Sequence, residues 1–128
     1  MLPSTLQAAD ALRPLVLVVD DEPMMRSVMM ATLREHYRVV ASADGKDAFA
    51  TFGVMGEPIA AVVTDVRMPR MNGLELAEAI GRMPAPPPVL FVSGFPGAPD
   101  QVPGPFLTKP FLPDALVQAV SELLAPAC

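Results

Sequence analysis

Apolar residues occur in short runs along this chain, and each run is followed at once by polar or turn-forming residues. The segments LVLVVD, IAAVVTD and PPVLFVS end at Asp20, Asp65 and Ser93. Short apolar runs between turn signals are typical of strands buried on both faces of a parallel sheet. The full pattern predicts strands at 15–19, 37–41, 59–65, 89–93 and 106–108, and helices at 24–35, 45–55, 74–82 and 113–124.

Strands and helices alternate along the chain with short connections. This order predicts an α/β fold in which a doubly wound parallel sheet carries helices on both faces. The connection between Ser93 and Phe106 is different, because it holds four prolines and three glycines. Each proline inside a helix costs about 3 kcal/mol. We therefore predict a Pro/Gly-rich loop there, since about a dozen residues suffice for a parallel crossover.

The first helix illustrates how periodicity predicts burial. At about 100° per residue, one face of the helix would hold the side chains that pack on the sheet. We predict that these buried side chains are Met25, Val28, Met29, Thr32 and Leu33. Met30 should point away from this face and offer an adaptable surface to a partner.

Polar side chains follow several of the predicted strands. Asp20 and Asp21 follow the first, Asp65 ends the third, Ser93 ends the fourth, and Lys109 comes just after the fifth. Ligands of open parallel sheets bind beyond the carboxyl ends of the strands, so these groups should meet at one edge. Three clustered carboxylates repel one another unless a cation lies among them, and hard oxygen ligands suit Mg²⁺.

The same groups predict a reaction. A carboxylate beside Mg²⁺ can attack phosphorus and form an aspartyl phosphate. A lysine ammonium and a serine hydroxyl nearby would bind the phosphoryl oxygens. The predicted product is therefore a phospho-aspartate.

The order and spacing of these residues, with the segment DVRMPRMNG at 65–73, resemble the receiver domain of two-component response regulators. The resemblance covers residues 15–125 and leaves 1–14 as an N-terminal extension or linker and 126–128 as a tail. It implies a flavodoxin-like sheet of five strands in the order 2-1-3-4-5. The Pro/Gly-rich segment would then shorten or replace the fourth helix of the family, which puts the usual dimerisation and output face in doubt.

The resemblance also implies a metal site. Asp21 and Asp65 would ligate Mg²⁺ directly, together with the backbone carbonyl of Arg67, and Asp20 would act partly through water. Mg²⁺ is accordingly the expected cofactor.

By the same resemblance, Asp65 would be the phosphoacceptor and Lys109 would hold the phosphoryl group. Ser93 would be the switch hydroxyl and Phe106 the switch aromatic. The bond between Lys109 and Pro110 matches one that is usually cis in the family, and only X-Pro bonds adopt cis cheaply.

Composition narrows the setting of this chemistry. With 128 residues the chain is long enough for one domain with one core, and no apolar run approaches the roughly 20 residues that span a bilayer. A net charge of −5 leaves no basic patch for direct nucleic-acid binding. The single cysteine, Cys128, cannot form an internal disulfide, which fits the reducing cytoplasm.

The expected phosphodonor is a histidine kinase or a histidine phosphotransfer protein, and the expected state is a monomer or weak dimer. The chain would be a stand-alone receiver or the terminal receiver of a hybrid kinase. It would catalyse only its own phosphorylation and dephosphorylation.

Two alternatives belong to other classes. One is a pseudo-receiver that is never phosphorylated and acts as an interaction module. The other is an aspartate-nucleophile phosphohydrolase, which is expected to carry Asp-x-Asp after one strand, whereas here Asp20 and Asp21 are adjacent.

Overall fold

The computed structural model describes residues 13–54, 58–68, 70–94 and 104–125. A five-stranded parallel sheet forms the centre of the fold, with the strand order β2-β1-β3-β4-β5 that the resemblance implies. The elements in chain order are β1 (Leu15–Val19), α2 (Pro23–Arg34), β2 (Arg38–Ser42), α3 (Gly45–Val54), β3 (Ala61–Asp65), α4 (Gly73–Gly81), β4 (Val89–Ser93), β5 (Phe106–Thr108) and α5 (Pro113–Leu124).

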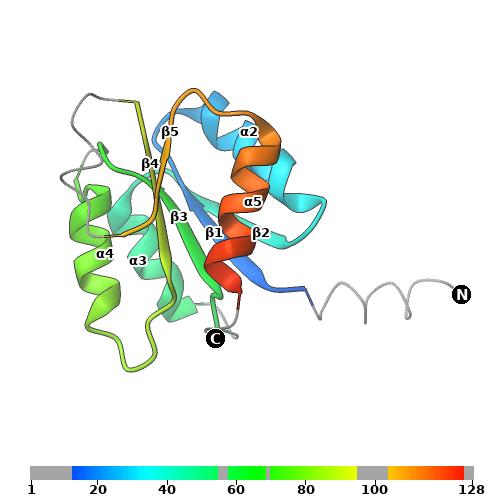
Figure 1. The fold of residues 1–128 in the computed structure, drawn as a ribbon. Coiled ribbons are helices and arrows are strands. Elements are labelled where there is room, and N and C mark those ends of the chain that lie inside the picture. The colour runs from blue at the N-terminus through cyan, green and yellow to red at the C-terminus, as the bar shows by residue number, and fades with distance from the viewer. Residues whose placement is uncertain (1–12, 55–57, 69, 95–103, 126–128) are drawn as a thin grey trace, which may run out of the picture.

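Helices cover both faces of the sheet, as the alternation of elements predicts (Figure 1). Side chains of β1 alternate between two cores because successive residues of a strand point to opposite faces. Val16 and Val18 pack with residues of α2 and α5, whereas Leu17 and Val19 pack with residues of α3 and α4. All five residues of β1 are buried, which explains why its sequence is a continuous apolar run.

Each helix begins with residues that are known to favour a helix start. Pro23 and Pro113 occupy the first turns of α2 and α5, where a missing N–H costs nothing. Asp44 accepts a hydrogen bond from the backbone N–H of Asp47 at 2.9 Å, as expected of the residue before α3. Asn72 and Glu75 form a reciprocal capping box at the start of α4.

The predicted burial along α2 is partly wrong. Met29 and Leu33 are fully buried, but Val28 is 46% exposed and Met30 is half-buried. The buried stripe is centred on Met29, so Val28 and Met30 lie about 100° to either side of its centre. Both residues therefore lie at the edges of the stripe.

The predicted Pro/Gly-rich loop lies mostly outside the described residues, because these omit 95–103. Most of the expected extension at 1–14 and all of the tail at 126–128 are also outside them. Those expectations stay predictions. Among the helices that the structure describes, none is long and apolar enough to cross a membrane.

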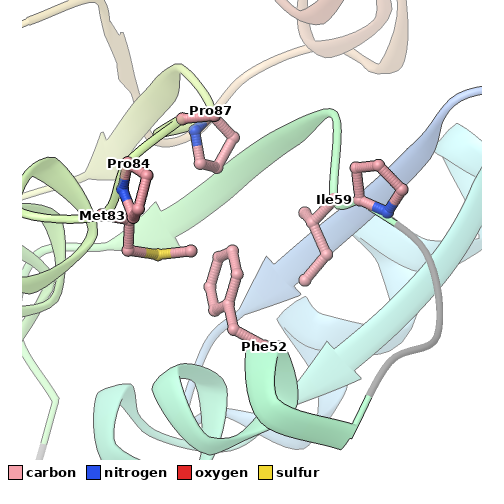
Figure 2. A pocket seen from close by; sticks show the side chains of 7 residues that line it. Phe52, Ile59, Met83, Pro84 and Pro87 are labelled. Atoms are coloured by element: carbon pink, nitrogen blue, oxygen red, sulfur yellow. The ribbon is translucent and has the colours of Figure 1, made fainter.

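An apolar pocket lies at the amino ends of β3 and β4. Its volume is about 300 Å³, and it is lined by Phe52, Pro58, Ile59, Met83, Pro84, Ala85 and Pro87. Figure 2 shows Phe52, from the last turns of α3, between Ile59 and the Met83–Pro87 segment that leads into β4. This pocket is at the end of the sheet opposite Asp65.

Candidate functional site

The acidic residues that the sequence analysis singles out do come together. β1 and β3 are parallel neighbours with Val19 opposite Thr64, so the next residues, Asp20 and Asp65, lie side by side. One carboxylate oxygen from each of Asp20, Asp21 and Asp65 lies within 4.8 Å of the others. Asp20 is fully buried, Asp65 is half-buried and Asp21 is exposed.

Lys109 follows the edge strand β5, and its side chain reaches this acidic cluster. Its backbone N–H donates to the carbonyl of Ser93 at 3.0 Å, which continues the pairing of β5 with β4. Its Nζ donates to Asp20 Oδ2 at 3.1 Å and to Asp65 Oδ2 at 3.4 Å. The peptide bond between Lys109 and Pro110 is cis, in agreement with the resemblance.

Burial and charge set the protonation of the cluster. Burial raises the pKa of Asp65, the ammonium of Lys109 opposes this, and the charge of Asp20 raises it further, so the net shift is upward. Burial lowers the pKa of Lys109, but its hydrogen bond to Asp20 and the charge of Asp65 outweigh burial and raise it overall. Lys109 is therefore a fixed positive charge between two carboxylates.

The other predicted site residues lie around this cluster. Ser93 is the last residue of β4, is 2% exposed, and is opposite Thr108 in the register. Phe106 begins β5 opposite Phe91 and is half-buried. Arg67 is exposed in the connection from β3 to α4. Their placement brings Ser93 to the same sheet edge as Asp65, but places Phe106 two residues further from that edge.

The sequence analysis missed residues that lie outside the acidic cluster and bond to its members or to the segments beside it. The guanidinium of Arg26 donates to the backbone carbonyl of Asp20 at 2.9 Å, and the backbone N–H of Glu22 donates to Asp20 Oδ1 at 2.9 Å. Arg26 could have been found, because it lies one turn into the helix that follows the acidic pair. Arg70, which donates a hydrogen bond to Asp44, could not have been found from its position in the sequence.

The donor set suits a divalent cation. Three carboxylates and one ammonium leave two negative charges in a small space, and all of the acidic ligands are hard oxygens. Such a set can hold Mg²⁺ and present one carboxylate to an electrophile.

Comparison with known proteins gives independent evidence of the family to which the chain belongs. Residues 16–121 match the family described as the response regulator receiver domain. The hydrogenase transcriptional regulatory protein HoxA of Bradyrhizobium diazoefficiens is 30% identical over 84% of this chain and 23% of its own length. The transcriptional regulatory protein TrcR of Mycobacterium tuberculosis is 33% identical over 85% of this chain and 44% of its own. The chain thus spans less than half the length of these curated relatives.

Solved structures give the same result for the fold. The chemotaxis response regulator CheY4 of Vibrio cholerae superposes with a TM-score of 0.76 and 28% identity, over 88% of this chain and 99% of that one. The receiver domain of the hybrid histidine kinase CckA superposes with a TM-score of 0.74 and 31% identity, over 87% and 99%.

Proposed function

We propose that this chain, which belongs to the family of response regulator receiver domains, accepts a phosphoryl group on Asp65 in two-component signalling. One observation carries the choice of site: three carboxylates lie within 4.8 Å of one another, and Lys109 bonds to two of them. Receiver domains are phosphoacceptor signalling modules that interact with histidine kinases or phosphotransfer proteins, so the phosphodonor is a phosphohistidine.

Asp65 is a better nucleophile than Asp20. Asp20 is fully buried, and both of its oxygens accept hydrogen bonds, from Glu22 N–H and from Lys109. Asp65 is partly accessible, and burial raises its pKa, which makes the carboxylate more basic than an ordinary one. These properties support attack by Asp65 and a positioning role for Asp20.

In the transfer step, an oxygen of Asp65 forms a bond to phosphorus while the bond from phosphorus to the donor imidazole nitrogen breaks. The electron pair of that bond stays on the imidazole. Lys109 lies 3.4 Å from Asp65 Oδ2, where its ammonium can bind an oxygen of the phosphoryl group. Lys109 also offsets part of the negative charge that the phosphoryl group adds.

The residues that would hold Mg²⁺ are Asp21, Asp65 and the backbone carbonyl of Arg67, with Asp20 acting partly through water. When bound, Mg²⁺ supplies positive charge that draws the phosphoryl oxygens to the site. We propose Ser93 and Phe106 as the switch pair, with Ser93 moving toward the phosphoryl group and Phe106 following inward. Ser93 is a good candidate because it is buried at the same sheet edge as Asp65.

The remaining parts of the proposal concern the setting. We propose that the chain makes no direct contact with nucleic acid, because its net charge is −5. We further propose a cytoplasmic location, a monomer or weak dimer, and catalysis limited to the chain's own phosphorylation and dephosphorylation.

Labelling by a small phosphodonor tests the proposal. The protein is incubated with acetyl phosphate and Mg²⁺, and its intact mass is measured. We expect one added phosphoryl group, none in Asp65→Asn or after chelation of Mg²⁺, and full labelling in the matched surface variant Asp114→Asn. Lys109→Ala should still be labelled but should signal poorly to its output.

The alternatives give other results. Undiminished labelling of Asp65→Asn would place the acceptor elsewhere. Rapid release of phosphate with no stable adduct would favour a phosphohydrolase, and absence of any reaction would favour a pseudo-receiver.

A further inference from the structure

The connection between β3 and α4 follows Asp65 directly and is tied to α3 by side chains. Arg70 Nε and Nη2 both donate to Asp44 Oδ2, at 3.0 and 2.5 Å, and Nη2 also donates to Asp47 Oδ1 at 2.9 Å. The backbone N–H of Gly45 donates to the carbonyl of Met71 at 3.1 Å. The connection is therefore fixed to the start of α3 through both side chains and backbone.

Asp44 is well prepared to hold Arg70. It is buried, and its Oδ1 accepts the Asp47 N–H, so its other oxygen is left for the guanidinium. The hydrogen bond from Asp47 N–H lowers the pKa of Asp44, burial opposes this, and Arg70 lowers it further, giving a net downward shift. The acceptor is a charged group in a fixed orientation.

Arg70 adopts an unfavourable backbone conformation to make this contact. Its φ is 66°, in the left-handed region that residues other than glycine rarely occupy. Its side chain is 52% exposed, so water weakens its ion pair with the buried Asp44 and limits the stability that the pair contributes. A strained residue that gains little stability from its ion pair indicates a positioning role.

The same connection is also closed on itself. The backbone N–H of Gly73 donates to the carbonyl of Val66 at 2.8 Å. A Cβ on Gly73 would lie 2.2 Å from the carbonyl oxygen of Asp65, so the two backbones are in direct contact. Arg67 lies between these closed ends, and the side chain of Arg70 ties the connection to α3.

We infer that Arg70, held by Asp44, is a positioning residue that fixes the segment carrying Arg67 beside the acidic cluster and so sets the affinity for Mg²⁺. The inference rests on the proposed function, which makes the Arg67 carbonyl a ligand. Arg70 touches neither the metal nor the phosphoryl group in this account. It acts through the backbone to which it belongs, whose ends are held by the bond from Gly73 N–H to the Val66 carbonyl and by the bond from Gly45 N–H to the Met71 carbonyl.

The test is direct titration of the unphosphorylated protein with MgCl₂ by calorimetry, comparing the parent with Arg70→Gly. Glycine tolerates the positive φ, so the variant loses the ion pair without adding strain. We expect roughly tenfold weaker binding, the lower end of the effect seen when a partner that orients metal ligands is lost. Unfolding in EDTA should show that Arg70→Gly remains folded.

The direction of the change separates positioning from simple electrostatics. Removal of a positive charge should strengthen Mg²⁺ binding if Arg70 acts only through its charge. Positioning predicts the opposite sign. Asp47→Asn is the matched control, because it removes only the charge of the outer, exposed partner of Arg70 and leaves the bond to Asp44 in place. The Mg²⁺ affinity of this variant should stay within about twofold of the parent.

A double-mutant cycle with Asp44→Asn completes the test. If the two residues act as one unit, the double variant should bind Mg²⁺ no more weakly than either single variant. Additive losses would overturn the positioning role. Unchanged or tighter Mg²⁺ binding by Arg70→Gly would also overturn it if Asp21→Asn still loses the metal. Both results would leave the proposed function intact. A parent protein that binds no Mg²⁺ would overturn both.

Discussion

Helices α3 and α4 each carry one glycine at the start and one near the end, and the two sets of glycines have opposite surroundings. A Cβ on Gly45 or Gly73 would lie 2.3 Å from the carbonyl oxygen of Met71 or 2.2 Å from that of Asp65. A Cβ on Gly53 or Gly81 would meet nothing within 4 Å. At the acidic end of the sheet, the start of each helix therefore packs against the backbone of another segment, whereas the Cβ positions of Gly53 and Gly81 at the other end face open space.

This difference separates what each end of the sheet can do. At the carboxyl ends of the strands, the contact between the backbones of Gly73 and Asp65 limits how far the backbone at Asp65 can shift, as a site that positions charges requires. At the amino ends, side chains such as Phe52 and Met83 surround an open pocket (Figure 2). Side chains can shift where backbones cannot, so substitutions at that end should affect stability without reaching the site.

The largest effect is expected from Gly73→Ala. The added methyl group must displace the backbone at Asp65, and overpacking of this kind costs about 3 kcal/mol of unfolding free energy. Urea unfolding monitored by circular dichroism measures the loss.

Gly81→Ala is the matched control on the same helix. Alanine is favoured over glycine in helices, so this variant should be more stable by about 0.5 kcal/mol. Equal effects of the two substitutions would remove the distinction between the two ends of α4.

A smaller effect is expected at the pocket from Phe52→Ala. Phe52 is only half-buried, so the loss should be about 1–2 kcal/mol, below that of a fully buried phenylalanine. The affinity for Mg²⁺ should stay unchanged in the same calorimetric titration, in contrast to Arg70→Gly. A tenfold loss of Mg²⁺ affinity would connect the two ends and contradict the comparison.

Much of the fold could be predicted from the sequence because its three central strands, β1, β3 and β4, are mostly buried. The predicted bounds of β4, β5 and α5 are confirmed without change. β4 is a continuous apolar run, and α5 begins at Pro113, a residue that favours the first turn of a helix. The edges of α2 were harder, because Val28 and Met30 lie at equal angles from the centre of the buried stripe. Their exposure depends on how the helix packs, which periodicity alone does not determine.

The acidic cluster could also be predicted, since parallel strands bring residues after their carboxyl ends to one edge. The contact between Arg70 and Asp44 could not. These residues are 26 positions apart, and an arginine with positive φ has no sequence signal. The roles of Ser93, Phe106 and Arg67 stay predictions.

The smallest effect concerns the charge of Asp65 in the absence of metal. Burial raises its pKa above the ordinary value of 3.8, so the folded protein holds the proton more tightly than the unfolded chain. The associated stability is present below that value and is lost as pH rises through the higher folded pKa. Asp65→Asn, which is always neutral, should therefore be slightly more stable than the parent at neutral pH, by less than the effect of Phe52→Ala.

Unfolding in EDTA at about pH 3 and about pH 7 checks this, and the advantage of Asp65→Asn should appear only at the higher pH. Lys109 keeps its bond to Asp20 in the variant, so no buried charge is left without a partner. Mg²⁺ should reverse the order, because it stabilises the parent by binding the folded state. An Asp65→Asn protein less stable than the parent at neutral pH without metal would mean that the attraction of Lys109 outweighs burial. The charges at the acidic end of the sheet would then stabilise the protein even without Mg²⁺. The difference between the acidic end and the end with the apolar pocket would then be a difference in packing alone.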